Sequence, residues 1–213
     1  MVYYFTSHCD GVDFLLYMGK DKFENELLIA HGWPEDVWFH ADNLSSAHVY
    51  VRLPEGVDFE SIPAQVLNDC AQLTKENSIK GKKQKSIKVV YTPWSNLHKT
   101  GAMEVGQVGF HKEKLRKYIV QVERDLAVLG RLKKTMQERT DVDFQLERLE
   151  HDKEENAKKR AFQREKDQEE RQLQAERARQ RELHSYDRVF IEADMQYNTD
   201  MKMGVDDYED SFM

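Results

Sequence analysis

The segment from Asn77 to Met103 contains a cluster of lysines and no acidic residue, in a chain that carries 39 aspartates and glutamates. Lysine ammonium groups neutralise nucleic-acid phosphates, and aromatic rings offer flat faces on which bases can stack. The segment supplies both, with amide and imidazole groups that could recognise a base. We assign as candidate nucleic-acid-binding residues Lys80, Lys82, Lys83, Lys85, Lys88, Tyr91, Trp94, Asn96, His98 and Lys99. The alternative is a solvated lysine turn between a helix and a strand, with Tyr91 and Trp94 in the core.

Three further basic residues could extend this surface. Lys20 and Lys22 lie at the start of a predicted helix, and Arg52 lies on a predicted strand. Side chains of a strand alternate between two faces. One face of residues 47–53 is apolar and predicts a core; the other, expected to be exposed or functional, carries His48, Tyr50 and Arg52.

A second group of residues could bind a metal or transfer protons. His40 and Asp42 share one face of a predicted strand, and His48 on the next strand could approach them. The alternative is a hydrogen-bonded structural pair that lines a ligand groove. Because the sequence shows no third ligand at helix spacing, no nucleophile elbow and no glycine-rich phosphate loop, we predict no catalysis, no metal and no cofactor.

The charge is unevenly distributed. The chain of 213 residues has 32 basic side chains and a formal net charge of −7, and residues 191–213 alone carry one basic and seven acidic side chains. An acidic protein is a poor candidate for indiscriminate nucleic-acid binding, but the total says nothing about a local basic face.

Hydropathy and cysteine content restrict the setting. The longest uncharged stretch of the first domain, Val89 to His98, has ten residues, whereas a membrane-spanning helix needs about 18 to 20 apolar ones. The N-terminal sequence lacks signal-peptide features, so we expect a cytoplasmic chain whose Cys9 and Cys70 are free thiols. Any membrane association would be peripheral or through a partner.

Residues 1–123 predict a globular α+β domain, with a single mixed sheet covered on one side by a helix. Helices are expected at Lys22–His31 and from a cap at Ser61 to Gly81. Short runs rich in β-branched and aromatic residues predict strands at Val2–Thr6, Phe14–Met18, Val37–Ala41, Ala47–Leu53, Ile87–Thr92, Val105–Phe110 and Arg116–Val122.

Residues 124–190 predict a long charged helix, with no proline and only Gly130 up to residue 183. The apolar heptad fails after about two repeats, which favours a solvated or weakly associating helix, hence a monomer or weak dimer, over a firm coiled coil. Two aspartates around Val142 predict a kink at Thr140–Asp143. Residues 191–213 are expected to be a disordered acidic tail.

Four motifs resemble the NFACT-R family: MGKDKFENELL at residues 18–28, GWPEDVWFH at 32–40, LSSAHVY at 44–50 and VVYTPWSNL at 89–97. The resemblance implies a domain that contacts RNA without established catalytic activity. For small stand-alone relatives it also implies the DNA binding and membrane location that have been proposed for them. Carried over motif by motif, it assigns binding to Lys20, Lys22, Asn25, His40, His48, Tyr91, Trp94 and Asn96. The chain lacks the N-terminal half of the larger ribosome-associated relatives, so their peptide-tailing role is not implied.

We therefore predict a non-enzymatic adaptor, linked to translation or acting as a DNA sensor, whose domain binds RNA or DNA through the lysine segment and neighbouring aromatics. Residues 124–213 would hold a protein partner. The alternative is a protein-interaction scaffold that works through the charged helix and acidic tail.

Overall fold

The computed structural model describes residues 1–184. Its centre is a seven-stranded sheet in the order β8-β5-β3-β4-β2-β1-β9, and each neighbouring pair is antiparallel. The α+β class is confirmed, with an antiparallel sheet in place of a mixed one. The strands are β1 (Val2–Cys9), β2 (Val12–Gly19), β3 (Asp36–Ala41), β4 (Val49–Arg52), β5 (Ser86–Pro93), β8 (Lys117–Glu123) and β9 (Gln137–Arg139).

The first hairpin shows how local sequence sets the register. Asp10 and Gly11 join β1 to β2 with φ angles of 52° and 79°. A two-residue turn with both φ angles positive suits the twist of paired strands, and Asp-Gly is a preferred sequence for it. The turn pairs Cys9 with Val12 and so fixes the pairing back to Val2 and Gly19.

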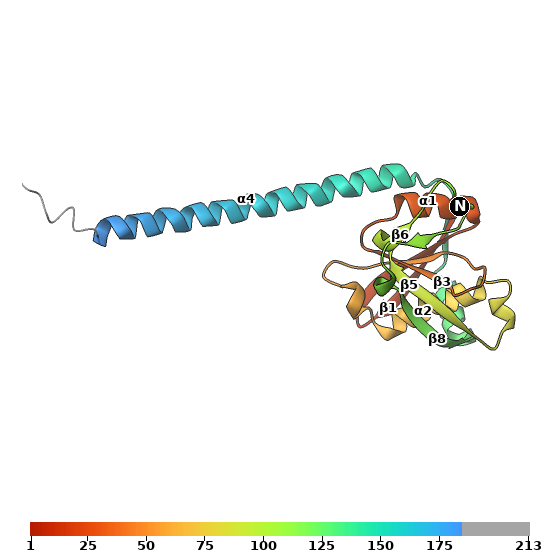
Figure 1. Ribbon diagram of the computed structural model, residues 1–213. Helices are drawn as coiled ribbons and strands as arrows, with labels where there is room; N and C mark the ends of the chain where they lie inside the picture. The colour runs from red at the N-terminus through yellow and green to blue at the C-terminus, as the bar shows by residue number, and fades with distance from the viewer. Residues whose placement is uncertain (185–213) are drawn as a thin grey trace, which may run out of the picture. The chain divides into compact units, whose positions relative to one another are not determined.

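Helices cover both faces of the sheet (Figure 1). One core lies between the sheet and two helices, α2 (Ala64–Glu76) and α3 (Leu126–Lys134). The other includes Leu28 of α1 (Lys22–His31), with Trp38 and Tyr50 on the sheet. The prediction of one covered face was wrong, because Tyr50 on β4, on the face expected to be exposed or functional, is buried in this second core, and His48 just before the strand is buried as well.

A small second sheet closes over the same face. It joins β6 (Leu97–His98) to β7 (Gly109–Phe110). The predicted strand Val105–Phe110 is strand only in its last two residues, because Gly106 has a φ of 83° and the Gln107 amide donates back to the carbonyl oxygen of Glu104 in a turn.

The second helix is shorter than expected. Pro63 precedes it and Asn77 ends it, so it stops before Gly81. Ser61 does not cap it: its hydroxyl accepts from the amide of Asp58 and donates to the carbonyl of that residue, within a separate short turn.

The predicted long charged helix is confirmed, but it begins at Phe144 and not at residue 124. Residues 124–143 hold α3 and then β9, which pairs with β1 and extends the sheet. Leu129 and Leu132 bury the inner face of α3, and the compact unit continues to Lys153. The predicted kink is a true interruption, because the Asp143 carboxylate accepts from the Leu146 amide at the start of the next helix.

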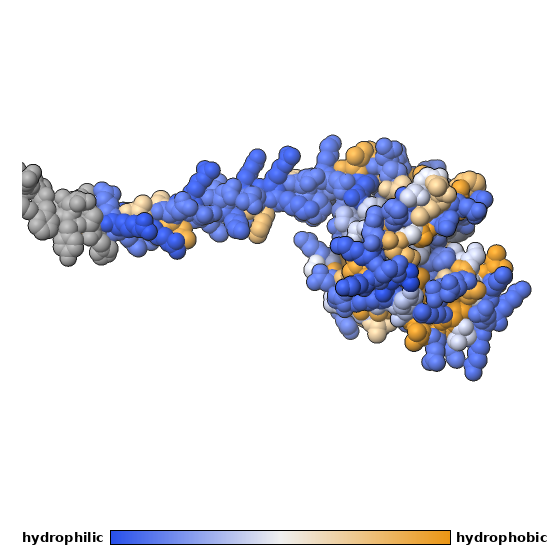
Figure 2. All heavy atoms as spheres, in the orientation of Figure 1, coloured by the Kyte–Doolittle hydropathy of each residue, from blue (hydrophilic) through white to orange (hydrophobic). Residues whose placement is uncertain are grey.

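That helix, α4 (Phe144–His184), has 41 residues, which corresponds to about 60 Å of length. Figure 2 shows that its surface is hydrophilic over most of its length. In residues 1–184, none of the helices has the length and apolar character needed to cross a membrane. The predicted disordered tail, 191–213, lies outside the described residues.

Candidate nucleic-acid interface

A buried lysine shapes the loop that carries most of the predicted lysines. Lys75, 1% exposed in the last turn of α2, donates from Nζ to the carbonyl oxygens of Gly81 at 3.3 Å, Gln84 at 2.9 Å and Lys85 at 3.4 Å. We call residues Lys80–Lys85 the lysine loop. Three contacts to one ammonium fix the backbone, so the side chains of the loop project from a defined platform.

The loop presents more positive charge than its surroundings neutralise. Lys82 pairs with Glu76 at 2.6 Å, and Arg124 binds the same carboxylate at 2.8 Å. Lys80, Lys83 and Lys85 are exposed, and none forms an ion pair with a carboxylate within residues 1–184. These ammonium groups are therefore available to bind anions.

Lys88 connects the lysine loop to a neighbouring groove. Its Nζ lies 3.7 Å from the ring centroid of Tyr118 on β8 and 3.4 Å from a carboxylate oxygen of Asp42. Asp42 lines a cavity of about 430 Å³, which we call the groove pocket. Lys88 thus lies at the rim of this pocket, with its charge paired with that of Asp42.

The groove pocket brings His40, Asp42 and His48 together, as the sequence suggested. The rings of His40 and His48 lie 5.1 Å apart at 82°, and both contact Trp38. Burial, and next the neighbouring His40 ring, lowers the pKa of His48 to about 3, and burial lowers the pKa of His40 as well. Both imidazoles are neutral at physiological pH and can take part in hydrogen bonds without carrying charge.

Several predicted binding residues have structural roles instead. Tyr91 is 8% exposed and stacks on Phe39 in the core. Trp94 donates from Nε1 to the carbonyl oxygen of Ile29 at 2.9 Å. Asn96 is buried and donates to Thr92 and to the carbonyl of Lys112. The alternative interpretation placed Tyr91 and Trp94 in the core; Tyr91 is buried there, whereas Trp94 is half-buried and has its indole nitrogen hydrogen-bonded.

Arg52, Lys99 and Asn25 are also held inside the fold. Arg52 donates from Nε to Asp36 at 2.9 Å, and Lys99 donates to Glu26 at 2.8 Å. Asn25 is 7% exposed, beside the backbone of Gly19. The charges of Arg52 and Lys99, whose side chains are 22% and 23% exposed, are thus paired with carboxylates, and Asn25 is buried.

The remaining candidates, Lys20, Lys22 and His98, lie outside the lysine loop. Lys20 and Lys22 are exposed around the start of α1, and the Lys22 ammonium lies 5.3 Å from the ring of Phe23. His98 is half-buried, with its ring centroid 4.8 Å from that of His111.

Sequence reasoning missed three residues of the site. Lys75 resembled an ordinary solvated lysine. Arg116 and Tyr118 are two residues apart in the predicted strand Arg116–Val122, so they share one face of it. This spacing could have indicated that both side chains belong to one surface. Arg116 lines the groove pocket, and its guanidinium lies 5.0 Å from the ring of Phe110.

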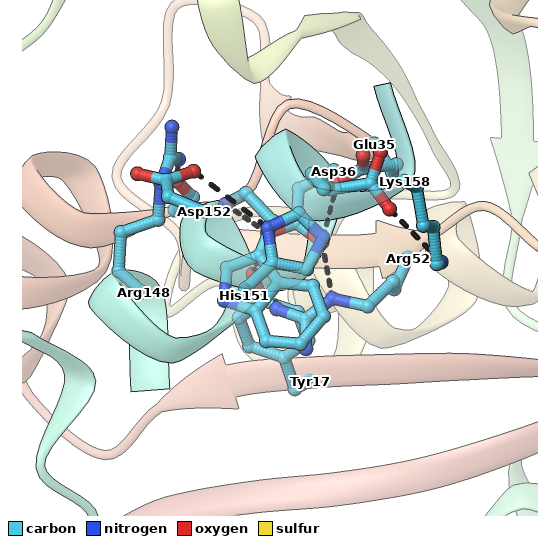
Figure 3. A network of polar contacts seen from close by, with 11 residues as sticks. Tyr17, Glu35, Asp36, Arg52, Arg148, His151, Asp152 and Lys158 are labelled. Atoms are coloured by element: carbon cyan, nitrogen blue, oxygen red, sulfur yellow. Dashed lines mark hydrogen bonds and ion pairs between the residues drawn. The ribbon is translucent and has the colours of Figure 1, made fainter. Parts of the chain in front are cut away.

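A polar network lies under the opposite end of the same face (Figure 3). The Asp36 carboxylate, with no exposed area, accepts from Arg52, from the Tyr17 hydroxyl at 2.6 Å and from the Trp33 amide at 2.7 Å. Arg52 stacks on Trp33 at 3.5 Å, and His151 stacks on the same ring at 3.9 Å. The network ties the first turns of α4 to β3 and β4.

No cluster of three or more histidine, cysteine or acidic side chains suited to a metal occurs in residues 1–184. Cys9 and Cys70 are unpaired and buried, and burial raises the pKa of each thiol above its usual value.

The sequence matches a known protein family and several named relatives. Residues 1–112 match the family described as NFACT protein RNA binding domain. Coiled-coil domain-containing protein 25 of Bos taurus is 48% identical over 202 residues, covering 94% of this chain and 96% of its own length. The protein of the same name from Danio rerio is 56% identical over 140 residues, covering 65% of this chain and 67% of its own. Protein JLP2 of Saccharomyces cerevisiae is 41% identical over 140 residues, covering 63% and 67%.

Proposed function

We propose that this chain, which belongs to the NFACT protein RNA binding domain family, binds RNA through its lysine loop and acts by binding, without enzymatic turnover. The observation that carries the proposal is the set of exposed lysines Lys80, Lys83 and Lys85, which lack carboxylate partners in the described part of the chain. Lys88 and Arg116 are the cationic side chains at the groove pocket, and each is paired with one carboxylate, of Asp42 at 3.4 Å and of Glu113 at 2.8 Å.

The physical basis of binding is phosphate neutralisation. Each ammonium that meets a phosphate releases condensed counterions, so affinity falls as salt rises, with a slope of about −0.7 per contact on a single strand. Because Lys75 fixes the loop backbone, the lysines lose little backbone freedom when they meet a strand. Formal acidity of the whole chain does not oppose this, since much of it lies in residues 191–213.

The test is a double charge reversal in the full chain, Lys83→Glu with Lys85→Glu. Binding of a labelled single-stranded RNA is measured by fluorescence anisotropy at two salt concentrations. We expect an affinity loss of tenfold or more and a salt slope reduced by about 0.7 per lysine. The matched control is Lys133→Glu with Lys134→Glu, two exposed lysines of α3 that change the net charge equally.

Equal losses in both double variants would show that net charge, and not the lysine loop, controls binding, and would contradict the proposal. DNA of the same sequence, single-stranded and duplex, is titrated in parallel. Tighter binding to DNA would replace RNA as the ligand while keeping the loop as the binding element.

A second function, holding a protein partner, is supported by apolar side chains on α4. Phe162 is 69% exposed and Leu173, three turns later, is 47% exposed on a helix that is mostly polar and charged and has further exposed leucines near its two ends. Apolar residues spaced by eleven lie close to one side of a helix. Deletion of residues 154–213 separates the two functions: RNA affinity should be retained, and a partner that depends on α4 should be lost.

A further inference from the structure

The groove pocket holds an unusual concentration of unpaired polar atoms. Three buried side-chain atoms, Trp38 Nε1, His48 Nδ1 and Arg116 Nε, have no hydrogen-bond partner among the described residues. All three side chains line this one cavity of about 430 Å³. A buried polar atom without a partner is costly, so three at one site indicate a place built to receive a polar ligand.

The half-buried walls of the pocket suit a flat ligand. Trp38 is buried and stacked on His40, at 4° and 5.4 Å, so the half-buried rings of His40 and Phe110 are the aromatic faces near the opening. The ring centroid of Phe110 lies 5.7 Å from that of Trp38. Arg116 lies over Phe110 with its guanidinium 5.0 Å from the ring. Aromatic and guanidinium planes are the surfaces on which unstacked RNA bases pack.

The hydrogen-bonding groups are mixed in kind. Trp38 Nε1 and Arg116 Nε are donors, the Asp42 carboxylate is an acceptor, and the neutral imidazole of His48 can offer either. The edge of a nucleobase carries donors and acceptors side by side, and such an edge could pair with this set. Lys88, at the rim beside Asp42, lies where it could contact a backbone phosphate.

We propose that the groove pocket receives one unpaired base of the RNA strand whose backbone the lysine loop binds. This inference rests on the proposed RNA-binding function and adds the class of ligand: single-stranded or looped RNA, with one base removed from the stack. A paired base inside a duplex cannot present its hydrogen-bonding edge to a pocket of this kind.

The test separates base recognition from phosphate recognition in the full chain. A short single-stranded RNA of mixed sequence, the duplex of the same sequence, and inorganic polyphosphate, which has charge but no bases, are compared as ligands. We expect the single strand to bind about tenfold more tightly than polyphosphate, and the duplex to gain no such advantage.

Two variants alter the pocket without changing the net charge: Trp38→Phe removes the indole donor, and Arg116→Lys replaces the planar guanidinium and its Nε donor by an ammonium. Each should reduce the preference for single-stranded RNA over polyphosphate while leaving polyphosphate affinity unchanged. The matched control is Tyr50→Phe, which removes a buried unpaired hydroxyl on the same sheet face outside the pocket and should keep the preference. Arg116 is half-buried, so its variant remains informative if Trp38→Phe fails to fold.

The outcomes are distinguishable. Equal affinity for single strand and polyphosphate would overturn the base-pocket inference and leave the lysine-loop function standing. If the chain binds none of the three ligands, the proposed function is refuted, and the inference with it. Binding of a free nucleoside monophosphate as tightly as the strand would overturn the inference by identifying a nucleotide site in its place.

Discussion

The ammonium of Lys75 donates a hydrogen bond of 2.9 Å to the carbonyl oxygen of Gln84, and so joins the end of α2 to the far side of the lysine loop. Two further carbonyls, of Gly81 and Lys85, share the same donor. The ammonium of Lys75 therefore holds the backbone of the loop, while those of Lys80, Lys83 and Lys85 remain available to a ligand.

Replacement of Lys75 by methionine should loosen the loop. The three carbonyl oxygens lose their donor, which we expect to lower the free energy of unfolding by about 1–3 kcal/mol. Urea unfolding measures the loss, and amide hydrogen exchange over residues 80–85 should become faster. In the control Lys80→Met, an exposed lysine of the loop is removed and both quantities should stay near the native values. Unchanged exchange in Lys75→Met would contradict the assigned role.

Removal of Arg52 should be costly because it leaves the buried Asp36 carboxylate without its cation. Loss of one partner of a buried ion pair costs about 3–5 kcal/mol, and the Tyr17 and Trp33 donors place Arg52→Ala near the lower end. The control is Lys117→Ala, whose pair with the exposed Glu60 should contribute at most about 1 kcal/mol. Urea unfolding measures the free energy of unfolding of both variants. Similar losses in Arg52→Ala and Lys117→Ala would refute the distinction between the buried and the exposed ion pair.

The stability of the domain should fall in acid through His48. Its folded pKa of about 3 lies below the ordinary value of 6.5, so between these values the unfolded chain binds a proton that the folded chain excludes. Stability contributed by the neutral ring is complete above pH 6.5 and is lost as pH falls toward 3, at up to about 1.4 kcal/mol per pH unit. Urea unfolding at pH 7, 6 and 5 should therefore show a shallower decline in His48→Asn. His111→Asn, which alters an exposed ring, should decline as the native chain does.

A chain ending at residue 123 should fail to fold, whereas one ending at residue 153 should fold. The shorter chain lacks the buried side chains of Leu129 and Leu132, and it leaves Asp69 without the 2.7 Å ion pair to Arg131. Circular dichroism and urea unfolding of both chains provide the measurement. A cooperative transition in chain 1–123 would show that α3 and β9 are dispensable.

A methyl group added at Gly32 should disrupt the contact between α1 and Trp94. A Cβ there would lie 2.3–2.8 Å from three atoms of the Trp94 indole, closer than packed atoms approach. We expect Gly32→Ala to lower the free energy of unfolding by about 1–3 kcal/mol, measured by thermal or urea unfolding. Gly101→Ala, where a Cβ meets nothing within 4 Å, is the control and should be nearly neutral.

The sequence predicted what depends on local pattern. Six of the seven predicted strands coincide with strands of the sheet, and the helix at Lys22–His31 has the predicted bounds. The adjacency of His40 and His48 followed from alternation on two strands. A kink near Thr140–Asp143 was predicted from two aspartates, which disfavour a helix interior, around the β-branched Val142.

The sequence could not predict what depends on distant neighbours. Whether Tyr91 and Trp94 lie in a core or on a surface is decided by Phe39 and by the backbone of α1, which pattern alone does not locate. Lys75 has the same composition signal as Lys80, and only the folded loop distinguishes them. The segment Gln137–Arg139 is polar throughout, and becomes a strand because the free edge of β1 supplies its hydrogen-bond partners.

The pairing of β1 with β9 can form only after most of the domain has been synthesised. The same applies to the hydrogen bond from the Thr6 amide to the Thr135 hydroxyl, which joins residues 129 positions apart. Until the ribosome has made this stretch, the outer edge of the nascent β1–β2 hairpin offers open amides and carbonyls to any passing strand. The finished edge is short and carries Glu138 and Arg139, a charged border of the kind that discourages further pairing. This edge of the sheet is thus open to pairing with other strands mainly during translation.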